Sequence, residues 1–124
     1  MDPTQFFLGY RMIVDKRKAE RVSYTSNVSA YRVAPSKSGN VFEVTQEPQI
    51  FPAVDVSRSG IRLATNRPLA DEAILKLKLE LRKKKPVDVF ARVVWSNHQH
   101  MGLKFIILHE EAQRDLAQFT SSPQ

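Results

Sequence analysis

The sequence predicts an all-β fold, a small antiparallel barrel covered by one C-terminal α-helix. Short apolar segments recur along the chain between Gly-, Pro-, Asn- and Asp-containing turns, a pattern typical of strands. The segment Ile74–Leu81 alternates apolar and polar residues, as a half-buried strand does. Only Glu110–Phe119, near the end, has a helical pattern. We expect the strands to close into a barrel because closure removes exposed strand edges.

Composition limits the class of protein. The chain has 124 residues, enough for one domain with one core, and 42% hydrophobic and 26% charged residues are ordinary values. Cysteine is absent, which excludes disulfides and thiolate chemistry. The apolar run Phe6–Leu8 is too short for a signal or membrane segment, so we expect a cytoplasmic location without membrane insertion. The net charge of +6 favours an anionic partner.

In the first half of the chain, strand patterns alternate with loops. Residues 1–14 are predicted to be a tail that packs on the domain or docks on a partner, since an exposed apolar patch permits both. Val22–Val33 is expected to be extended, and Ala34–Asn40 to be a loop because of its Pro, Gly, Ser and Asn content. Two further strands are expected, at Val41–Thr45 and Gln49–Val54.

The second half is more regular. Arg82–Lys85, before Pro86, predicts a soluble basic turn of the kind that protects a strand edge. Gly102 indicates a bulge or a close backbone approach. Glu110 and Glu111 lie where the helix dipole favours acids. The remaining strands are expected at Ile61–Ala64, Ile74–Leu81, Val87–Trp95 and Met101–Ile107, followed by the helix at Glu110–Phe119.

The turn between Gln49–Val54 and Ile61–Ala64 contains candidate binding residues. Asp and Ser side chains bond nearby backbone N–H groups in turns, and Gly allows a positive φ or a close backbone approach. The same groups suit a ligand: Asp55 can accept from ring or amino N–H groups, Ser57 offers a hydroxyl, and Gly60 leaves room. We therefore interpret this turn as one half of a nucleotide site.

The second candidate is the pair Arg17 and Arg21 in the basic stretch Arg11–Arg21. Arginines four residues apart lie on one side of a helical turn or a compact loop. A guanidinium binds phosphate oxygens in a bidentate manner and stacks on purines. The alternative is a solvated linker, which charge runs usually are.

Taken together, four segments resemble the PilZ domain family in content and order: Arg17-x-x-x-Arg21, Asp55-x-Ser57-x-x-Gly60, Ala91–Trp95 and Gly102–Phe105. The resemblance implies a barrel of about six strands, here with an extended hairpin, over residues 15–120, with a tail at 121–124. It also implies a receptor for the bacterial second messenger cyclic di-GMP. The implied ligand residues are Lys16, Arg17, Arg21, Asp55, Ser57, Arg58 and Gly60.

The chemistry of these residues agrees with such a ligand. Arg17 and Arg21 supply cations for two phosphates, and the Asp55 carboxylate can accept from guanine N1–H and N2–H₂. Hydrogen bonds to charged groups contribute about 1.5–3 kcal/mol each, so a few of them predict micromolar binding, about −8 kcal/mol. The region around Lys16 helps decide in this family whether one ligand or a stacked pair binds, and both alternatives stay open. We hypothesise that Arg11–Arg21 is mobile without ligand, becomes ordered with it, and signals to a protein partner.

Catalysis, a metal site and a cofactor are not expected. The His98 and His100 pair lacks cysteine or carboxylate partners, and no histidine is placed by a motif to activate Ser57. One alternative function is a small barrel that binds single-stranded nucleic acid, which we expect less because the aromatic residues fall at core positions. Another is an adaptor of the same fold that binds proteins and no nucleotide.

Overall fold

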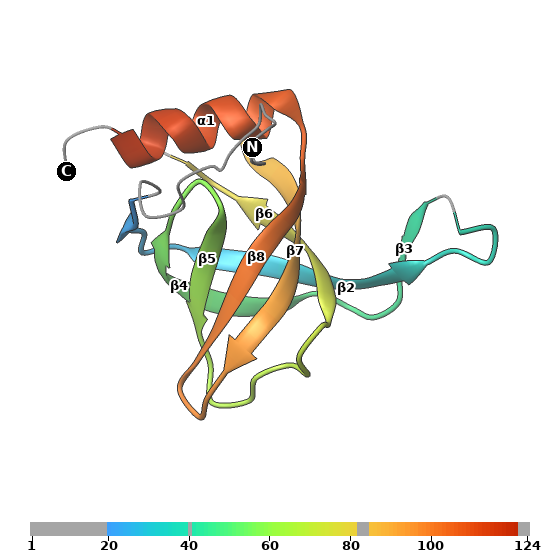
Figure 1. The fold of residues 1–124 in the computed structure, drawn as a ribbon. Helices are drawn as coiled ribbons and strands as arrows, with labels where there is room; N and C mark the ends of the chain where they lie inside the picture. The colour runs from blue at the N-terminus through green and yellow to red at the C-terminus, as the bar shows by residue number, and fades with distance from the viewer. Residues whose placement is uncertain (1–19, 40, 82–84, 122–124) are drawn as a thin grey trace, which may run out of the picture.

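The computed structural model describes residues 20–39, 41–81 and 85–121, and its described part contains eight strands and one helix. The helix lies over one end of the strands (Figure 1). In chain order the elements are β1 (Val22–Ser23), β2 (Asn27–Pro35), β3 (Phe42–Val44), β4 (Gln49–Val56), β5 (Gly60–Ala64), β6 (Ile74–Leu79), β7 (Val87–Ser96), β8 (His100–Leu108) and α1 (Glu110–Ser121).

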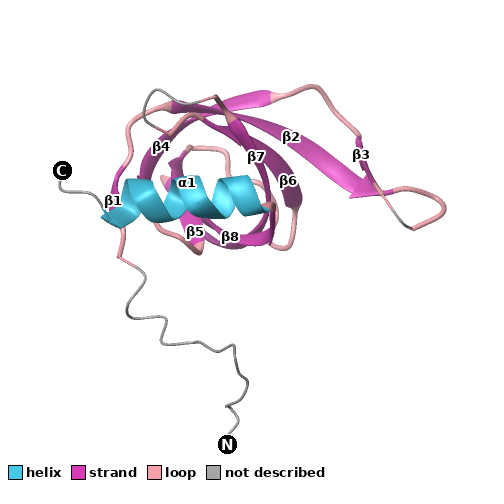
Figure 2. Ribbon diagram, turned by 90° about the horizontal axis from the view of Figure 1, so that it is seen from above, coloured by secondary structure: helices cyan, strands magenta, loops and turns pink. Residues whose placement is uncertain are grey.

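Six of these strands form a closed antiparallel barrel. The order around the ring is β4, β5, β8, β7, β6 and β2, and β2 pairs back to β4. β2 serves two neighbours because its residues 27–30 pair with β4 while residues 29–32 pair with β6. Figure 2 shows the strands as a ring, with the helix lying across its near end, when the molecule is seen from above. The predicted six-stranded barrel with one C-terminal helix is therefore confirmed, with β1 and β3 added outside the ring.

Alternating side chains fill the barrel. Along β6, Leu75, Leu77 and Leu79 are at most 1% exposed, while Lys76 and Lys78 between them are not buried. The alternation predicted for this strand is confirmed, although the strand ends at Leu79 rather than at Leu81. Burial on this scale is the main contribution to stability in a domain of this size.

The helix closes one end of the barrel. Its residues Ala112 and Leu116 are at most 2% exposed and belong to the same core as the strands. Tyr24, just after β1, packs edge-on against Phe119 of α1 with ring centroids 5.6 Å apart. The Tyr24 hydroxyl donates to the carbonyl of Glu80 and accepts from its N–H, both at 3.0 Å. Tyr24 thus links the segment after β1, the end of β6 and the helix.

The extended hairpin is formed by β2 and β3. It projects from the barrel (Figure 1), and β3 pairs only with the far end of β2, from Val33 to Pro35, among the described strands. Phe42 of β3 stacks on Phe90 of β7, with centroids 5.2 Å apart, and this contact ties the hairpin to the barrel.

Several strand boundaries differ from those expected. The extended segment Val22–Val33 is divided, because residues 24–26 leave the ladder while Tyr24 turns its ring into the core. β4 continues to Val56, so Asp55 lies in a strand and not in the turn. The basic turn Arg82–Lys85 lies outside the described residues apart from Lys85. The helix α1, the one helix in the described ranges, is too short and too polar to cross a membrane.

Candidate functional site

A row of paired residues crosses five strands on the outer face of the barrel. Ser23 of β1 pairs with Asp55 of β4, and Asp55 pairs with Arg62 of β5. Arg62 then pairs with Gly102 of β8, and Gly102 with Trp95 of β7. Residues that face one another across strands lie close enough for their side chains to interact. Sheet pairing therefore brings together side chains that are far apart in the sequence.

Two β-bulges give this row its outward-facing side chains. In β4 the register shifts between Ala53 and Asp55, and in β7 it shifts between Val93 and Trp95. Ala53 and Val93 face the core, so strict alternation would also turn Asp55 and Trp95 inward. A bulge inserts one residue and redirects the side chains that follow it. Each register shift lies directly before one of these two side chains, Asp55 in β4 and Trp95 in β7, and points it outward into the site.

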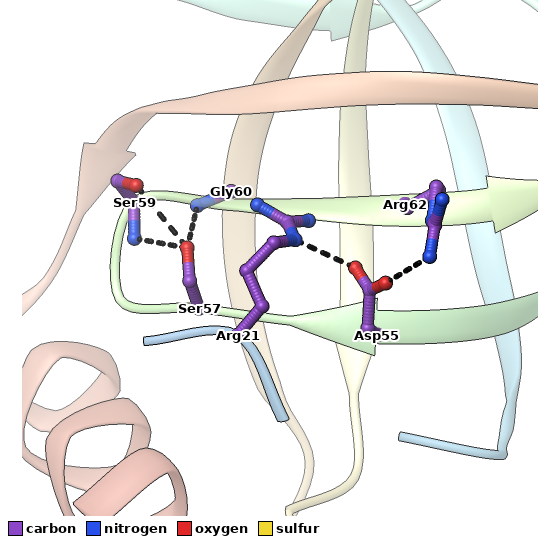
Figure 3. Close-up of polar contacts among 6 residues, drawn as sticks. All are labelled: Arg21, Asp55, Ser57, Ser59, Gly60 and Arg62. Carbon is purple, nitrogen blue, oxygen red and sulfur yellow. Dashed lines mark hydrogen bonds and ion pairs between the residues drawn. The ribbon is translucent and has the colours of Figure 1, made fainter. Parts of the chain in front are cut away.

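The Asp55 carboxylate is bound by an arginine on each oxygen (Figure 3). Arg21 donates from Nε to Oδ1 at 2.7 Å, and Arg62 donates from Nη2 to Oδ2 at 2.5 Å. Arg21 reaches the carboxylate because it lies two residues before Ser23, a diagonal neighbour across the β1–β4 ladder. The Asp55 side chain is only 14% exposed, whereas those of Arg21 and Arg62 are 46% and 39% exposed.

The turn that follows β4 is fixed by Ser57. Its Oγ accepts from the N–H of Ser59 at 3.1 Å and from the N–H of Gly60 at 3.2 Å, and Ser57 is 1% exposed. Gly60 is needed for a close approach and not for a positive φ: an added Cβ would lie 2.4 Å from the carbonyl oxygen of Leu103. The motif thus holds β5 tightly against β8.

A hollow of about 480 Å³ opens beside this row. A volume of this size is in the range of small-molecule sites. Three cationic side chains line it, those of Arg21, Arg62 and Lys104, against the single carboxylate of Asp55. Apart from Ser59 in the turn before β5, the remaining lining is apolar or glycine and comes from β5, β7 and β8. Such a hollow can hold an anion together with a flat apolar group.

The flat surface in the hollow is the indole of Trp95. Its ring occupies the space where Gly102 lacks a side chain, since a Cβ there would lie 2.1 Å from Trp95 Nε1. The indole is nevertheless 42% exposed, so part of it is open to solvent. The expectation that the aromatic residues occupy core positions is therefore wrong for Trp95, because the bulge before it turns the ring outward.

The structure unites the two predicted motifs in part. Arg21, Asp55 and Gly60 all line the hollow. Lys16 and Arg17 lie outside the described residues. Ser57 is buried in the turn, and Arg58 lines a separate hollow near the end of α1.

Sequence reasoning missed Arg62, Trp95 and Lys104 as lining residues of the hollow. Gly102 was the available signal for Trp95, because a glycine inside a strand indicates that something approaches closely. Arg62 gave no signal, since an isolated arginine on the polar face of a strand is ordinary. In the described part of the chain, no three His, Asp or Glu side chains gather as metal ligands would.

Comparisons with known proteins agree on one family. A sequence model described as "PilZ domain" matches residues 15–122. Similar solved structures include the PilZ domain of CeSA from a cellulose-synthesizing bacterium, with 12% identity, a TM-score of 0.57 and coverage of 82% of this chain and 95% of that one. The PilZ domain of Escherichia coli YcgR with c-di-GMP has 11% identity, a TM-score of 0.62 and coverages of 86% and 89%.

A third similar structure is the K. pneumonia MrkH–c-di-GMP complex, with 18% identity and a TM-score of 0.55. It covers 85% of this chain, which spans only 51% of that protein. Identities this low establish the shared fold alone. A search of curated protein sequences found no match.

Proposed function

The chain belongs to the PilZ domain family, and we propose that it is a receptor for cyclic di-GMP that binds the dinucleotide beside Asp55. The observation that carries the proposal is the meeting of Arg21 and Asp55, from two separate motifs, at one cationic hollow. Two similar structures, those of YcgR and MrkH, are described as containing c-di-GMP. The hollow supplies the groups that such a ligand needs, and no chemical step is required of the protein.

Each part of the ligand has a matching group. The phosphates are matched by the guanidinium of Arg21, and by that of Arg17, which lies outside the described residues. A guanine edge with N1–H and N2–H₂ is matched by the Asp55 carboxylate, which only accepts. The open face of Trp95 provides a surface on which a guanine can stack, a contact that contributes about 1–3 kcal/mol per base.

In this proposal Ser57 and Arg58 have different roles from Asp55. Ser57 acts on the ligand through the turn that it holds, because its Oγ already accepts two backbone N–H groups. Arg58 lies beside Glu20 and the end of α1, where it can meet the segment that enters the barrel. Gly60 keeps the floor of the hollow free of a side chain.

Signal output is the second part of the proposal. Arg21 lies immediately before the two-residue strand β1, at the end of the predicted basic stretch Arg11–Arg21. A ligand that binds Arg21 therefore acts directly on that stretch. We propose that binding orders Arg11–Arg21 and presents it, with residues 1–14, to a protein partner. Hydrogen exchange with and without cyclic di-GMP tests this step: protection of residues 11–21 should increase, and unchanged protection would contradict it.

Titration calorimetry with cyclic di-GMP tests the binding site. The unchanged chain should bind with a dissociation constant of about 1 μM, and Arg21→Ala and Asp55→Ala should each weaken binding at least about tenfold. Arg67→Ala is the matched control, because it removes one exposed positive charge from a turn outside the hollow. If neither site variant changes the affinity, the site is assigned wrongly even though the chain binds the ligand.

Single-stranded nucleic acid is the second candidate, favoured by the exposed Trp95 beside three cations. The same calorimetry with short oligonucleotides separates the two functions. Binding of oligonucleotides without binding of cyclic di-GMP would replace the proposal. Binding of neither would favour a protein-binding adaptor.

A further inference from the structure

The two arginines that bind Asp55 are anchored very differently. Arg62 lies within β5 between Ile61 and Leu63, both 0% exposed, and is paired on either side, with β4 and with β8. Arg21 precedes a strand of two residues that pairs with β4 alone among the described strands. Both guanidinium groups contact the same carboxylate, but only the backbone of Arg62 is fixed by the barrel.

The orientation of the Arg62 guanidinium depends on Asp55. Its Nη2 makes the ion pair with Oδ2, whereas its Nε is buried and has no hydrogen-bond partner among the described residues. A buried donor without a partner is unfavourable. The Asp55 carboxylate is therefore the contact that fixes the guanidinium, and through the same ion pair the barrel-anchored Arg62 fixes the carboxylate.

When the ligand phosphates bind Arg21, as the proposed function requires, the Asp55 carboxylate loses its partner at Oδ1. The Asp55 side chain is only 14% exposed, so there is little room for water to replace that partner. A poorly hydrated carboxylate without a cation is strongly disfavoured. Arg62 is the remaining cation at 2.5 Å, and because it uses only one of about four acceptor positions, the carboxylate can still accept from a guanine.

We propose that Arg62 is a positioning residue of the ligand site, one that holds the Asp55 carboxylate toward the guanine edge while Arg21 transfers from Asp55 to a phosphate. This inference rests on the proposed function and assigns a role to a residue outside the two sequence motifs. Arg62 acts through Asp55 and does not itself bind the ligand. Guanine is favoured because its N1–H and N2–H₂ donors face the acceptor that Arg62 orients, whereas an adenine presents its N1 acceptor there.

A double-mutant cycle on cyclic di-GMP affinity tests this role. In the unchanged background, Arg62→Gln should weaken binding about tenfold, the size expected for losing one charge-assisted contact. In the Asp55→Asn background, the same substitution should change the affinity less than about twofold, because the residue through which it acts is gone. Arg62→Lys keeps the positive charge, so it should lose less affinity than Arg62→Gln. Arg67→Gln, the same change outside the hollow, should leave the affinity unchanged.

Equal losses in both backgrounds would show that Arg62 contacts the ligand itself and would overturn the inference, as would an unchanged affinity for Arg62→Gln. If Asp55→Asn binds too weakly to measure, the comparison is made instead with cyclic di-IMP, a ligand that lacks the guanine amino group. Arg62→Gln should then lower the affinity for cyclic di-GMP more than the affinity for cyclic di-IMP. An equal loss of affinity for the two ligands would overturn the inference. Failure of the unchanged chain to bind cyclic di-GMP would instead overturn the proposed function, and this inference with it.

Discussion

Replacing Gly102 by alanine tests whether the open indole of Trp95 serves the ligand. The new Cβ would lie 2.1 Å from Nε1 and 2.3 Å from Cε2 of the indole. Atoms in contact settle near about 3.5–4.0 Å, so the ring must retreat by more than about 1 Å. Because Trp95 is 42% exposed, it can retreat toward solvent, and we expect the free energy of unfolding to fall by less than about 1 kcal/mol.

The cost should appear in binding. Losing a base stacked on an aromatic ring costs about 1–3 kcal/mol, so calorimetry should show cyclic di-GMP affinity reduced about tenfold. Gly60→Ala is the matched comparison, because its Cβ would lie 2.4 Å from the Leu103 carbonyl oxygen, a backbone atom that cannot move away as the indole can. The free energy of unfolding of that variant, measured in urea, should therefore fall by about 1–3 kcal/mol.

Two results would refute this reasoning. If Gly102→Ala destabilises the fold as much as Gly60→Ala does, the indole is fixed in place and is not an adjustable surface. If Gly102→Ala leaves the affinity unchanged while Trp95→Ala lowers it, the position of the ring over Gly102 does not matter for the ligand. In the Trp95→Ala background, the Gly102 substitution should have almost no effect on affinity.

Further predictions concern stability. Burial raises the pKa of the Tyr24 hydroxyl above its ordinary value of 10.0, so the unfolded chain loses this proton first and stability should fall as pH rises above about 10. Tyr24→Phe should remove that part of the fall in urea denaturation, and parallel pH profiles would contradict the assignment. Ser57→Ala leaves two backbone N–H groups without their acceptor, so the free energy of unfolding in urea should fall by about 1–3 kcal/mol. Weaker ligand binding at unchanged stability would instead indicate that Ser57 contacts the ligand directly. Leu77→Ala, at 0% exposure, should cost about 2–5 kcal/mol, whereas Lys78→Ala on the outer face should change stability by less than about 0.5 kcal/mol; similar losses for the two would refute the assigned facing.

Local patterns were sufficient for most of the elements, though not for all of their boundaries. The alternation in Ile74–Leu81 predicted both the strand β6 and the face that it buries, because side chains on a strand have a period of two. The acidic first turn and apolar spacing of α1 predicted the helix, and Ala112 and Leu116 are buried as that spacing requires. Asp55 and Gly60 were found because Asp-x-Ser-x-x-Gly is a local pattern of residue types, although Asp55 itself lies in β4 and not in the turn.

What the sequence determined by itself, then, was most of the strands, the helix, the core faces of Ile74–Leu81 and of the helix, and the resemblance to the family that matches residues 15–122. Only the tertiary structure decided which strands are neighbours, and so it alone made Arg62 and Trp95 part of the hollow around Asp55. The physical reason is that ladder partners are distant in sequence and that a bulge reverses the inward–outward pattern of the side chains after it. Strict alternation from Ala53 and Val93 would point Asp55 and Trp95 toward the core, and one shift of register in β4 and another in β7 turns both toward the site.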